Sequence, residues 1–557
     1  MSSKRRNRSW ASHKAKRQKV LKYVLKLLCE NLVPVDEKVI LEKASRVLDI
    51  DEKEIRNYLD EGIAKGIFQV IDKGIRCEHC LEDISLKDIR RLICEDISDI
   101  KDIIGIKIHC IYCNNDFIVT EEHIYKYYKL TYRSLDRCKE LEMVHSMVPE
   151  MKLLGYLADK KLRQLKEKGL EKPFKRYYFI IVLHFLRDLI PLTKELIKFG
   201  AEPSKMYFLC KPYPYAYKDK IKFFLVGEGC NVYIASSIKD LEKRVISVLN
   251  EIKQKVESER RKFIIVEDGG YVVPCLHKKF SEIIGYCKGA VEQTTKGVTR
   301  DKRLDIKIPV LSVAECEFKR RYEPRFVGDA VVRNIWDMLP DERFEGRIAI
   351  LVGYGTIGPE IAKRLRDVLR MIVYVVEERA ERRDEARAQG FQVFKDVRSC
   401  LERSECMDRC MLIVGTTGRT SIGKDEIAKL PHNVILVSAS SDRDEIDVDE
   451  LELLAASNKE PLYSSRDRQK IGTVYELVRL DPPRKVTLLA DGYPVNFYYS
   501  ESVPNKSFDP ILTILFLATL ELAIRRDLNP GVDKNIVDDI VEREQVVKEM
   551  ERLYRLV

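Results

Sequence analysis

The sequence predicts an α/β protein with two doubly wound parallel sheets, preceded by a small winged-helix and cysteine-rich module. Three observations carry this prediction. Strand-like apolar runs alternate with helical stretches from residue 177 onward, a glycine-rich turn joins a strand to a helix in the second half, and two Cys-x-x-Cys pairs precede the α/β region. The 557 residues suffice for about three or four domains of ordinary size.

Composition and charge exclude several classes of protein. Hydrophobic residues make up 45% and charged residues 34% of the chain, which excludes a disordered, collagenous or small disulfide-stapled protein. The formal net charge is +10, but residues 1–22 hold nine Lys/Arg and no acid, so the rest of the chain is nearly neutral. We therefore expect any affinity for a polyanion such as nucleic acid to belong to this basic tail.

The head begins with three predicted helices, at 19–30, 36–48 and 51–65, followed by a β-like run at 66–74. This order is typical of a winged helix, whose third helix reads DNA in the nucleic-acid-binding versions. Here that helix begins Asp51-Glu52-Lys53-Glu54, and its acids would repel phosphate. Docking of the head to DNA, to RNA or to protein therefore stays open.

Two cysteine pairs predict a metal site. Cys77-x-x-Cys80 and Cys110-x-x-Cys113 each suit a knuckle that offers two thiolates to one tetrahedral Zn²⁺. A histidine beside each pair is an alternative ligand. The competing interpretation is four unrelated cysteines in a small insert.

The remaining cysteines are scattered, which suits a reducing compartment better than a disulfide framework. The N-terminus lacks the apolar segment of a signal peptide, and the longest apolar runs are too short to span a membrane. We expect a cytoplasmic protein without a membrane partner.

After a polar helical stretch at about 121–172, strands and helices alternate as in doubly wound sheets. The predicted strands are Tyr178–Leu183, Met206–Cys210, Lys222–Val226, Val232–Ala235, Phe263–Val266, Arg347–Val352, Ile372–Val376, Met411–Val414 and Val434–Val437.

A dinucleotide-binding turn is the sharpest local signal. Gly353-Tyr354-Gly355-Thr356-Ile357-Gly358 ends one strand and opens a helix, and the next strand ends at Glu377. The glycines permit a tight turn and close backbone approach, while the helix N-terminus faces a pyrophosphate. Glu377 would accept hydrogen bonds from ribose hydroxyls and repel a 2′-phosphate, which favours NAD over NADP. The competing interpretation is a glycine turn that binds nothing.

Residues from about 177 to 525 resemble the S-adenosylhomocysteine hydrolase family in the order of their motifs. The matching segments are Leu183-His184-Phe185 with Phe199-Gly-Ala-Glu202, Glu267-Asp268-Gly269-Gly270, Glu292-Gln293-Thr294-Thr295-Lys296-Gly297-Val298, Lys319, the glycine turn, Thr416-Thr417-Gly418, Asp444-Glu445-Ile446-Asp447, Ala490-Asp491-Gly492 and Val495-Asn496.

The resemblance implies a reaction and a set of site residues. In that family a tightly held NAD⁺ oxidises the ribose 3′-hydroxyl, homocysteine is eliminated, water adds, and the ketone is reduced back. Carried over, Lys319 would act at O3′ with Glu323 in place of the family's aspartate, and His184 with Asp268 near C5′ and C4′. The implied NAD contacts are Gly353, Gly355, Thr356, Ile357, Gly358, Glu377, Thr294, Thr295, Thr416, Thr417, Gly418 and Asn496. The resemblance also implies a homo-oligomer and an adenine-nucleoside ligand.

The chain departs from the family mainly in its chemical half. Gln293 replaces a second carboxylate, and Pro324 replaces an asparagine after Glu323. The segment Ser438–Arg443 has no histidine where the family does, and Gly328 stands where the family has a cysteine beside NAD.

Several of these residues have simpler interpretations. His184 can be a core histidine, and Lys319 can lie in a solvated basic turn. Tyr213, Tyr215 and Tyr217 lie where the family grips homocysteine; they can stack on a base, but packing within a turn is favoured.

These inferences give the expected organisation: a basic disordered tail (1–18), a winged-helix-like domain (19–75), a zinc-knuckle insert (76–120), a helical connector (121–175), a substrate-type α/β domain (176–327 and 493–557) and a Rossmann NAD-binding domain (328–492). We expect an NAD-binding, hydrolase-like protein with a depleted catalytic set that senses a ligand and signals to its head. The alternatives are an active NAD-dependent hydrolase of S-adenosylhomocysteine or a related nucleoside thioether, and a nucleic-acid-binding protein that uses the hydrolase-like body as a scaffold.

Overall fold

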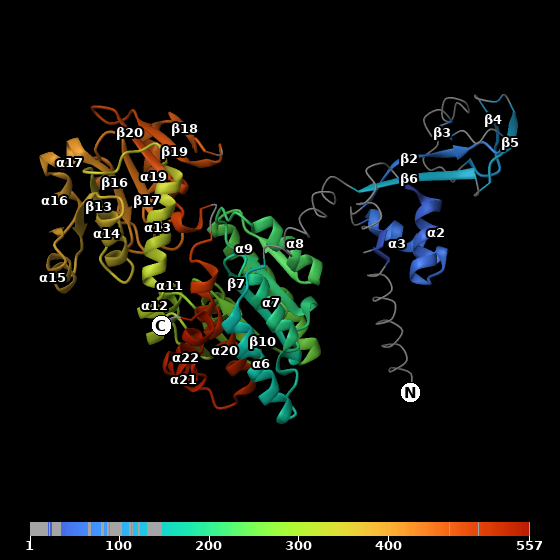
Figure 1. The fold of residues 1–557 in the computed structure, drawn as a ribbon, viewed down its shortest axis with the longest axis horizontal. Coiled ribbons are helices and arrows are strands. Elements are labelled where there is room, and N and C mark those ends of the chain that lie inside the picture. Colours follow the sequence, from blue (N-terminus) through green and yellow to red (C-terminus); the bar gives the residue numbers. More distant parts are fainter. Residues whose placement is uncertain are drawn as a thin grey trace. The chain divides into compact units, whose positions relative to one another are not determined.

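The computed structural model describes residues 20–21, 23–24, 35–64, 68–79, 83–85, 89, 103–110, 113, 115–120, 123–130, 148–466, 468–498 and 501–555. The chain divides into two compact units, residues 1–146 and 147–557. Each unit is described by itself, with the labels of Figure 1.

Among its described residues from 35 to 130, the first unit combines the helices α2 and α3 with an antiparallel sheet. The helices are α2 (Glu37–Leu48) and α3 (Glu52–Ala64), and their apolar faces pack into one small core. The sheet has the order β1-β6-β2-β3, with β1 (Val35–Asp36), β6 (Ile124–Leu130), β2 (Phe68–Arg76) and β3 (Asp83–Ser85). A separate hairpin pairs β4 (Lys107–His109) with β5 (Asp116–Ile118).

The cysteine-rich insert lies between the two longest strands of this sheet. Residue Phe68 of β2 pairs with Leu130 of β6, and Ile75 pairs with Ile124, so the strands meet across residues 77–123. The helix predicted from residue 121 is wrong at its start, because the aromatic and branched side chains of Ile124–Leu130 favour a strand. The winged-helix assignment of this unit stays a prediction.

The second unit contains a seven-stranded parallel sheet in the order β21-β12-β11-β10-β7-β8-β9. Its strands are β7 (Tyr177–Leu183), β8 (Met206–Cys210), β9 (Asn231–Ile234), β10 (Lys262–Glu267), β11 (Cys287–Glu292), β12 (Pro309–Ser312) and β21 (Gly531–Asp533). Central strands such as β7 are buried on both faces, which explains their continuous apolar sequences. The strand predicted at Lys222–Val226 is wrong, since these residues belong to helix α8 (Lys218–Glu228), which ends at Gly229 in a left-handed conformation.

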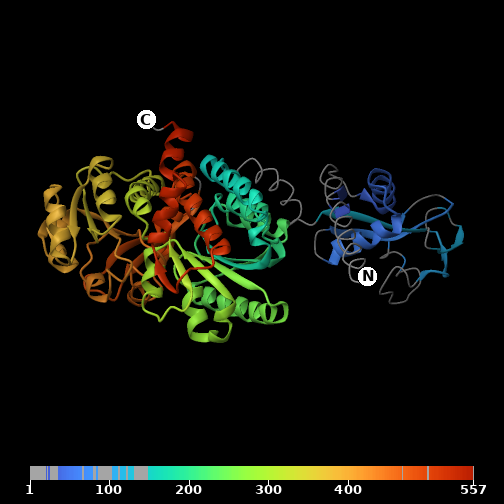
Figure 2. The ribbon, with the colours of Figure 1, turned by 90° about the horizontal axis from the view of Figure 1, so that it is seen from below.

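Helices cover both faces of this sheet (Figure 2). On one face α9 (Ile238–Glu259) and α10 (Val272–Lys279) join a core with alternate residues of β7 and β10. The other face packs against α20 (Asn505–Ile524), which also contacts α6 (Lys152–Glu167), α7 (Leu189–Lys198), α21 (Asn535–Arg543) and α22 (Val546–Tyr554). The described part of the chain has one helix apolar and long enough to cross a membrane, α20, and 78% of its apolar window is buried inside the protein.

The other sheet of this unit has eight strands in the order β15-β14-β13-β16-β17-β20-β19-β18. The strands are β13 (Ile348–Val352), β14 (Ile372–Val376), β15 (Gln392–Phe394), β16 (Cys410–Gly415), β17 (Val434–Ser438), β18 (Lys459–Tyr463), β19 (Lys470–Leu477) and β20 (Arg484–Leu489). The prediction of a wholly parallel sheet needs a correction, because β18 and β19 pair antiparallel at one edge. Two α/β bodies with doubly wound sheets are otherwise present as predicted.

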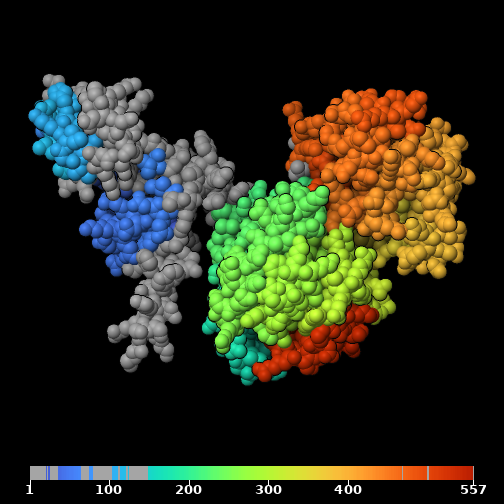
Figure 3. Space-filling model, turned by 180° about the vertical axis from the view of Figure 1, so that it is seen from behind, coloured from blue at the N-terminus to red at the C-terminus, as the bar shows by residue number. Residues whose placement is uncertain are grey.

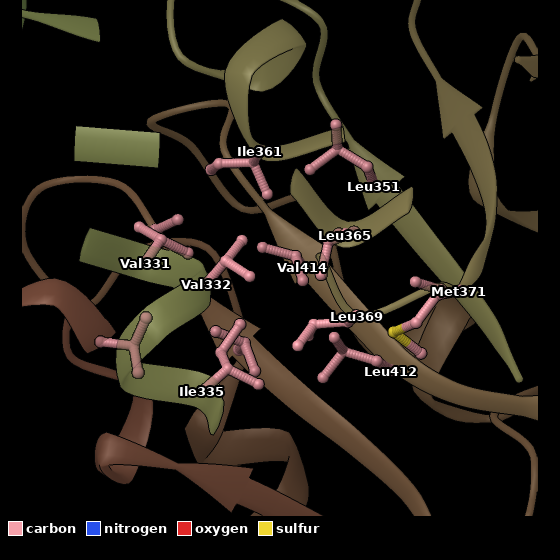
Figure 4. Close-up of a cluster of buried hydrophobic side chains, with 14 of the residues drawn as sticks. Val331, Val332, Ile335, Leu351, Ile361, Leu365, Leu369, Met371, Leu412 and Val414 are labelled. Atoms are coloured by element: carbon pink, nitrogen blue, oxygen red, sulfur yellow. The ribbon is translucent and has the colours of Figure 1, made fainter. Parts of the chain in front are cut away.

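Two layers of helices enclose this second sheet. Helices α13 (Pro324–Met338) and α14 (Gly358–Asp367) pack on one face, where Val332, Leu351 and Leu365 meet in the core shown in Figure 4. The opposite face holds α16 (Val397–Leu401), α17 (Ser404–Arg409), α18 (Lys424–Ile427) and α19 (Val448–Ala455). The remaining helices are α11 (Thr295–Asp301), α12 (Glu317–Tyr322) and α15 (Ala380–Ala388).

Candidate cofactor and substrate site

A cavity of about 1090 Å³ lies at the carboxyl ends of strands from both sheets of the second unit. Figure 3 shows the two halves of this unit in contact, green to lime around the seven-stranded sheet and yellow to orange around the eight-stranded one. All four predicted catalytic residues line the cavity: His184, Asp268, Lys319 and Glu323. Ligands of doubly wound proteins bind at such strand ends, so the topology itself selects this position.

The glycine turn after β13 has the geometry of a dinucleotide site. Gly353 has φ +101°, and a Cβ there would lie 2.8 Å from Thr416 Oγ1. A Cβ on Gly358 would lie 2.3 Å from the Gly353 carbonyl oxygen, so this position needs glycine. By contrast, a Cβ on Gly355, which lines the cavity, would meet only Arg379 Nη2, at 4.0 Å. Two glycines therefore shape the turn, and the third leaves room for a ligand.

Most of the predicted NAD contacts gather on this cavity. Those that line it are Thr294, Thr295, Gly355, Thr356, Ile357, Thr416, Thr417, Gly418 and Asn496. The buried carboxylate of Glu445 fixes the Thr416–Gly418 loop, because it accepts a hydrogen bond from Thr417 Oγ1 at 3.0 Å and one from the backbone N–H of Gly418.

Glu377 lies at the end of β14, as predicted, but beside the cavity wall and not on it. Its carboxylate accepts hydrogen bonds from the backbone N–H groups of Tyr354, at 2.8 Å, and Arg379, at 3.0 Å. Burial opposes ionisation, but these hydrogen bonds hold the pKa of Glu377 below its usual range. The carboxylate is thus ionised beside the cavity, where it accepts hydrogen bonds from two backbone N–H groups.

Three buried polar atoms of the cavity wall have no hydrogen-bond partner among the described residues. They are Gln293 Oε1, Ser440 Oγ and Asn496 Oδ1. Buried polar groups are nearly always paired, so these two amide oxygens and one hydroxyl, in residues that line the cavity, are candidate contacts of a bound ligand. Together with the glycine turn, these atoms fit a dinucleotide and a second polar ligand.

A buried lysine that the sequence analysis missed organises the His184 end of the cavity. Lys211 is fully buried, and its ammonium donates to Asp268 Oδ1. Asp268 Oδ2 accepts from Gln293 Nε2 at 2.8 Å and lies 3.2 Å from His184 Nε2. Lys211 directly follows β8, as His184 directly follows β7, so their placement at adjacent parallel strand ends was a usable signal.

This network sets the charges of the site. Burial lowers the pKa of His184 more than the neighbouring Asp268 raises it, so the imidazole is neutral at pH 7. Burial alone would raise the pKa of Asp268, but the charge of Lys211 and the contacts with His184 hold it well below its usual range. Asp268 is therefore an ionised acceptor that resists protonation.

Lys319 and Glu323 form a second pair on the cavity wall. Lys319 Nζ donates to the Gln293 carbonyl oxygen at 2.7 Å and lies 3.3 Å from Glu323 Oε2. The interpretation of Lys319 as part of a solvated turn is wrong, because the residue is only 8% exposed.

Aromatic side chains close the cavity behind His184. Its ring stacks on Phe497 with centroids 4.0 Å apart, and its Nδ1 pairs with Tyr215 OH at 2.6 Å. Tyr213 and Tyr215 are 0% and 4% exposed and pack against each other and against Phe497. These tyrosines thus belong to a packed wall. Tyr217 is partly exposed, beside Arg187.

Asp442 is a second buried residue that the sequence analysis missed. It follows β17 of the eight-stranded sheet, yet its partners come from the other half of the unit. Its Oδ1 accepts from Tyr271 OH at 2.5 Å and Tyr213 OH at 3.1 Å. Its Oδ2 lies 2.7 Å from Lys296 Nζ and 3.4 Å from Arg300 Nη2. This network joins the two halves beside the cavity.

Three buried carboxylates, Glu267, Glu292 and Asp301, lie beneath the site with oxygen atoms within 4.8 Å of one another. Three backbone N–H groups donate to Glu267, and Gly269, Gly270 and Thr294 donate to Glu292. Neither oxygen of Asp301 has a partner among the described residues. Burial and the charge of Glu267 raise the pKa of Asp301 to about 8, so we place a proton on this residue at pH 7.

Asp301→Asn is expected to raise the free energy of unfolding by about 1–3 kcal/mol at pH 7.5. The unfolded chain releases this proton above pH ~4, but the folded chain holds it up to a pKa of about 8. The wild type therefore loses stability as the pH rises from 4 to 8, while the amide does not. Urea unfolding at pH 4.5 and pH 7.5 measures the difference in free energy of unfolding between Asp301→Asn and the wild type. This difference should be larger at pH 7.5. An equal difference at both pH values would contradict the protonated state of Asp301.

In the first unit, three of the four predicted zinc ligands come together. The Sγ atoms of Cys77, Cys110 and Cys113 lie within 4.8 Å of one another, and those of Cys77 and Cys113 are 3.7 Å apart. Cys80 lies outside the described residues. The ring of His109 is half exposed and pairs with Asp116 at 2.7 Å, and His109 is not part of this thiol group.

Comparison with known proteins agrees with this geometry. Residues 326–464 match the family model for the D-isomer specific 2-hydroxyacid dehydrogenase, NAD binding domain. The chain is 26% identical to S-inosyl-L-homocysteine hydrolase of Methanocaldococcus jannaschii, over 61% of this chain and 76% of that protein. It is 27% identical to adenosylhomocysteinase of Sulfurisphaera tokodaii, over 61% of this chain and 75% of that protein.

Among solved structures, a dipicolinate synthase chain of Bacillus halodurans matches with a TM-score of 0.29 and 11% identity, over 50% of this chain and 87% of that chain. No conclusion rests on so low a score. The sequence relatives and the family model agree that the body of this protein is adenosylhomocysteinase-like and that it includes an NAD-binding domain.

Proposed function

We propose that the second unit holds NAD together with an adenine-type nucleoside and acts as a sensing or regulatory body, without the full hydrolase reaction. The observation that carries this proposal is the state of the ionisable groups at the end of the cavity beside His184. Asp268 is neutralised by Lys211, Gln293 has no acidic group, and both ring nitrogens of His184 already have partners. Among the described residues, none of Asp268, Gln293 and His184 is therefore a free acceptor for a proton taken from the ligand.

The residues beside the glycine turn suit a different task. When bound, NAD⁺ supplies a hydride acceptor. Lys319 and Glu323 form the paired cation and carboxylate that can orient a ribose hydroxyl and hold its proton. Thr294 and Thr295 add hydroxyls to the same wall. The site thus retains groups for binding and orienting a sugar, and lacks those for eliminating a leaving group.

The decisive experiment joins mass spectrometry of co-purifying small molecules with an assay for homocysteine release from S-adenosylhomocysteine. We expect bound NAD(H) and no turnover above background at high protein concentration. Turnover that disappears in Lys319→Ala would establish the alternative, an active NAD-dependent hydrolase. A protein that carries no nucleotide and shows no thermal shift with NAD would contradict both the sensing function and the hydrolase function.

For the first unit we propose a structural zinc ion held by Cys77, Cys80, Cys110 and Cys113. The 3.7 Å separation of two Sγ atoms supports it, because thiolates about 2.3 Å from a tetrahedral Zn²⁺ lie roughly 3.8 Å apart. Metal analysis of the full chain should find about one zinc ion, and a Cys77→Ser/Cys110→Ser variant should have none. No metal in the wild type, purified without chelator, would end this proposal.

Binding of nucleic acid is proposed only for the basic tail at residues 1–18, which lie outside the described residues. The exposed side of α3 carries Glu52 and Asp60 beside Lys53 and Arg56, so it offers no excess of positive charge to phosphate. Docking of the head to a protein partner, and assembly into a homo-oligomer, are further proposals.

A further inference from the structure

We propose that Arg303 and Arg320, on the wall of the cavity, bind a phosphate monoester, and that the second ligand is therefore a nucleotide in preference to a neutral nucleoside. The inference rests on the proposed function and names its ligand class more closely. Three observations support it: the charge of these two arginines is not compensated, the acidic side chains near them are paired with other cations, and an ion pair holds their two segments together.

The first observation concerns the charge of the cavity wall. Arg303 and Arg320 are exposed, and neither side chain has an ion pair or a hydrogen bond with any described residue. The other Lys and Arg side chains of the wall each lie beside a carboxylate: Lys296 and Arg300 beside Asp442, Lys319 beside Glu323, and Arg419 beside Glu378. Two guanidinium groups are thus available to an anionic ligand.

The acidic side chains near these arginines already have cationic partners. Glu315 lines the same wall, but its carboxylate pairs with Lys302 at 2.6 Å. Glu317, in helix α12 with Arg320, pairs with Arg321, whose side chain is 80% exposed and does not line the cavity. This part of the wall, which we call the α11–α12 rim, therefore keeps an excess of positive charge.

The fold brings both arginines to this rim. Arg303 follows helix α11, Arg320 lies in α12, and strand β12 separates them in the chain. The ion pair between Lys302 and Glu315 joins the two segments next to Arg303. On the other side, the backbone N–H of Arg320 donates to the carbonyl oxygen of Cys316, the residue after Glu315. The two arginines thus belong to one part of the cavity wall.

The charge and shape of these groups favour phosphate. A phosphate monoester carries a charge of about −1.5 to −2 at pH 7, which two guanidinium groups match better than the single charge of a carboxylate. Each guanidinium can donate two parallel hydrogen bonds to phosphate oxygens. The pyrophosphate of NAD has its own expected place, at the glycine turn and the N-terminus of α14. The rim is therefore left for the second ligand.

Isothermal titration of the full chain saturated with NAD tests the inference. The ligands are adenosine, its 2′-, 3′- and 5′-monophosphates, and inorganic phosphate. At least one monophosphate should bind about 10- to 100-fold more tightly than adenosine, the ratio expected for hydrogen bonds between charged groups. Added salt should reduce this preference, because exposed charges are screened. Inorganic phosphate should bind more weakly than that monophosphate; equal or tighter binding would identify free phosphate as the ligand and overturn the nucleotide.

Two variants test the rim itself. Arg303→Ala/Arg320→Ala should lower the affinity for the preferred monophosphate about 10- to 100-fold, to the level of adenosine. Because neither side chain has a partner among the described residues, we expect this double variant to fold. Arg321→Ala is the matched control, since it removes the neighbouring guanidinium, which pairs with Glu317 outside the cavity, and it should bind the monophosphate like the wild type.

The outcomes separate this inference from the proposed function. If no monophosphate binds more tightly than adenosine, or if the preference survives in the double variant, the inference is overturned and the proposed function stands. Loss of NAD binding in the double variant would assign the rim to the cofactor's own phosphates and would also overturn it. Absence of binding of NAD, adenosine and every monophosphate to the wild type would instead contradict the proposed function.

Discussion

Asp442→Ala is expected to lower the free energy of unfolding by about 3–5 kcal/mol. The carboxylate is 2% exposed and lies among Tyr213, Tyr271, Lys296 and Arg300. Removing it leaves two buried tyrosine hydroxyls and two partly exposed cations without their shared acceptor, and each unsatisfied buried hydroxyl alone costs about 1–3 kcal/mol. Urea unfolding followed by circular dichroism gives the change in stability.

The pH dependence of Asp442 provides a second measurement. Burial opposes ionisation, but Lys211 and Lys296 lower the pKa of Asp442 to about 2. Its stabilising effect is therefore complete above the unfolded pKa of about 4 and is lost as the pH falls toward 2. The difference in free energy of unfolding between the wild type and Asp442→Ala should thus decrease as the pH falls from 4 to 2.

Asp444→Ala is the matched control. Asp444 also pairs with Lys296, at 2.5 Å, but its side chain is 49% exposed. The Asp444→Ala variant should therefore lose less than about 1 kcal/mol of unfolding free energy. Equal losses for the two variants would mean that the network beside the cavity behaves like an ordinary surface ion pair.

Gly355→Ala should abolish detectable NAD binding, an effect of at least about 100-fold, without changing the stability of the ligand-free protein. A Cβ at this position meets no atom closer than 4.0 Å, so the fold accommodates it. Gly355 lines the cavity at the turn, and in this motif the pyrophosphate must approach the backbone closely, so an added methyl group is expected to obstruct the cofactor.

Gly358→Ala is the comparison variant, because we expect it to affect the folding of the turn and not only the binding of NAD. Its Cβ would lie 2.3 Å from the Gly353 carbonyl oxygen, so the turn itself must move and the ligand-free protein should lose stability. Thermal melts without ligand and calorimetric titration with NAD distinguish the two variants. Unchanged NAD affinity in Gly355→Ala would place the cofactor elsewhere.

Much of the α/β body is predictable from local patterns. Parallel strands that are buried on both faces have continuous apolar sequences, and the glycine turn has its own signature, so β7, β10, β13 and β14 lie where the sequence places them. Lys222–Val226 misleads because four apolar residues within a helix resemble a short strand. The antiparallel edge formed by β18 and β19 depends on tertiary pairing that no local pattern encodes.

The candidate site likewise contains residues that the sequence identifies and residues that only the fold identifies. His184, Asp268 and Lys319 are found because a family pattern marks them, and the structure brings them to one cavity. Lys211 and Asp442 carry no motif. Their importance comes from burial next to opposite charges that are distant in the chain, 57 residues away for Lys211 and at least 142 for Asp442, which only the fold determines.

The pairing of β2 with β6 has a consequence for how the first unit responds to its surroundings. Ile75 and Ile124 are neighbours across the ladder, so the two ends of the cysteine-rich insert are held together by strand pairing and not by the thiols. Because the sheet already closes that long loop, bringing the cysteines together costs less chain entropy. If the zinc ion proposed above is removed by chelation, we therefore expect the β2–β6 ladder and the core of α2 and α3 to stay folded.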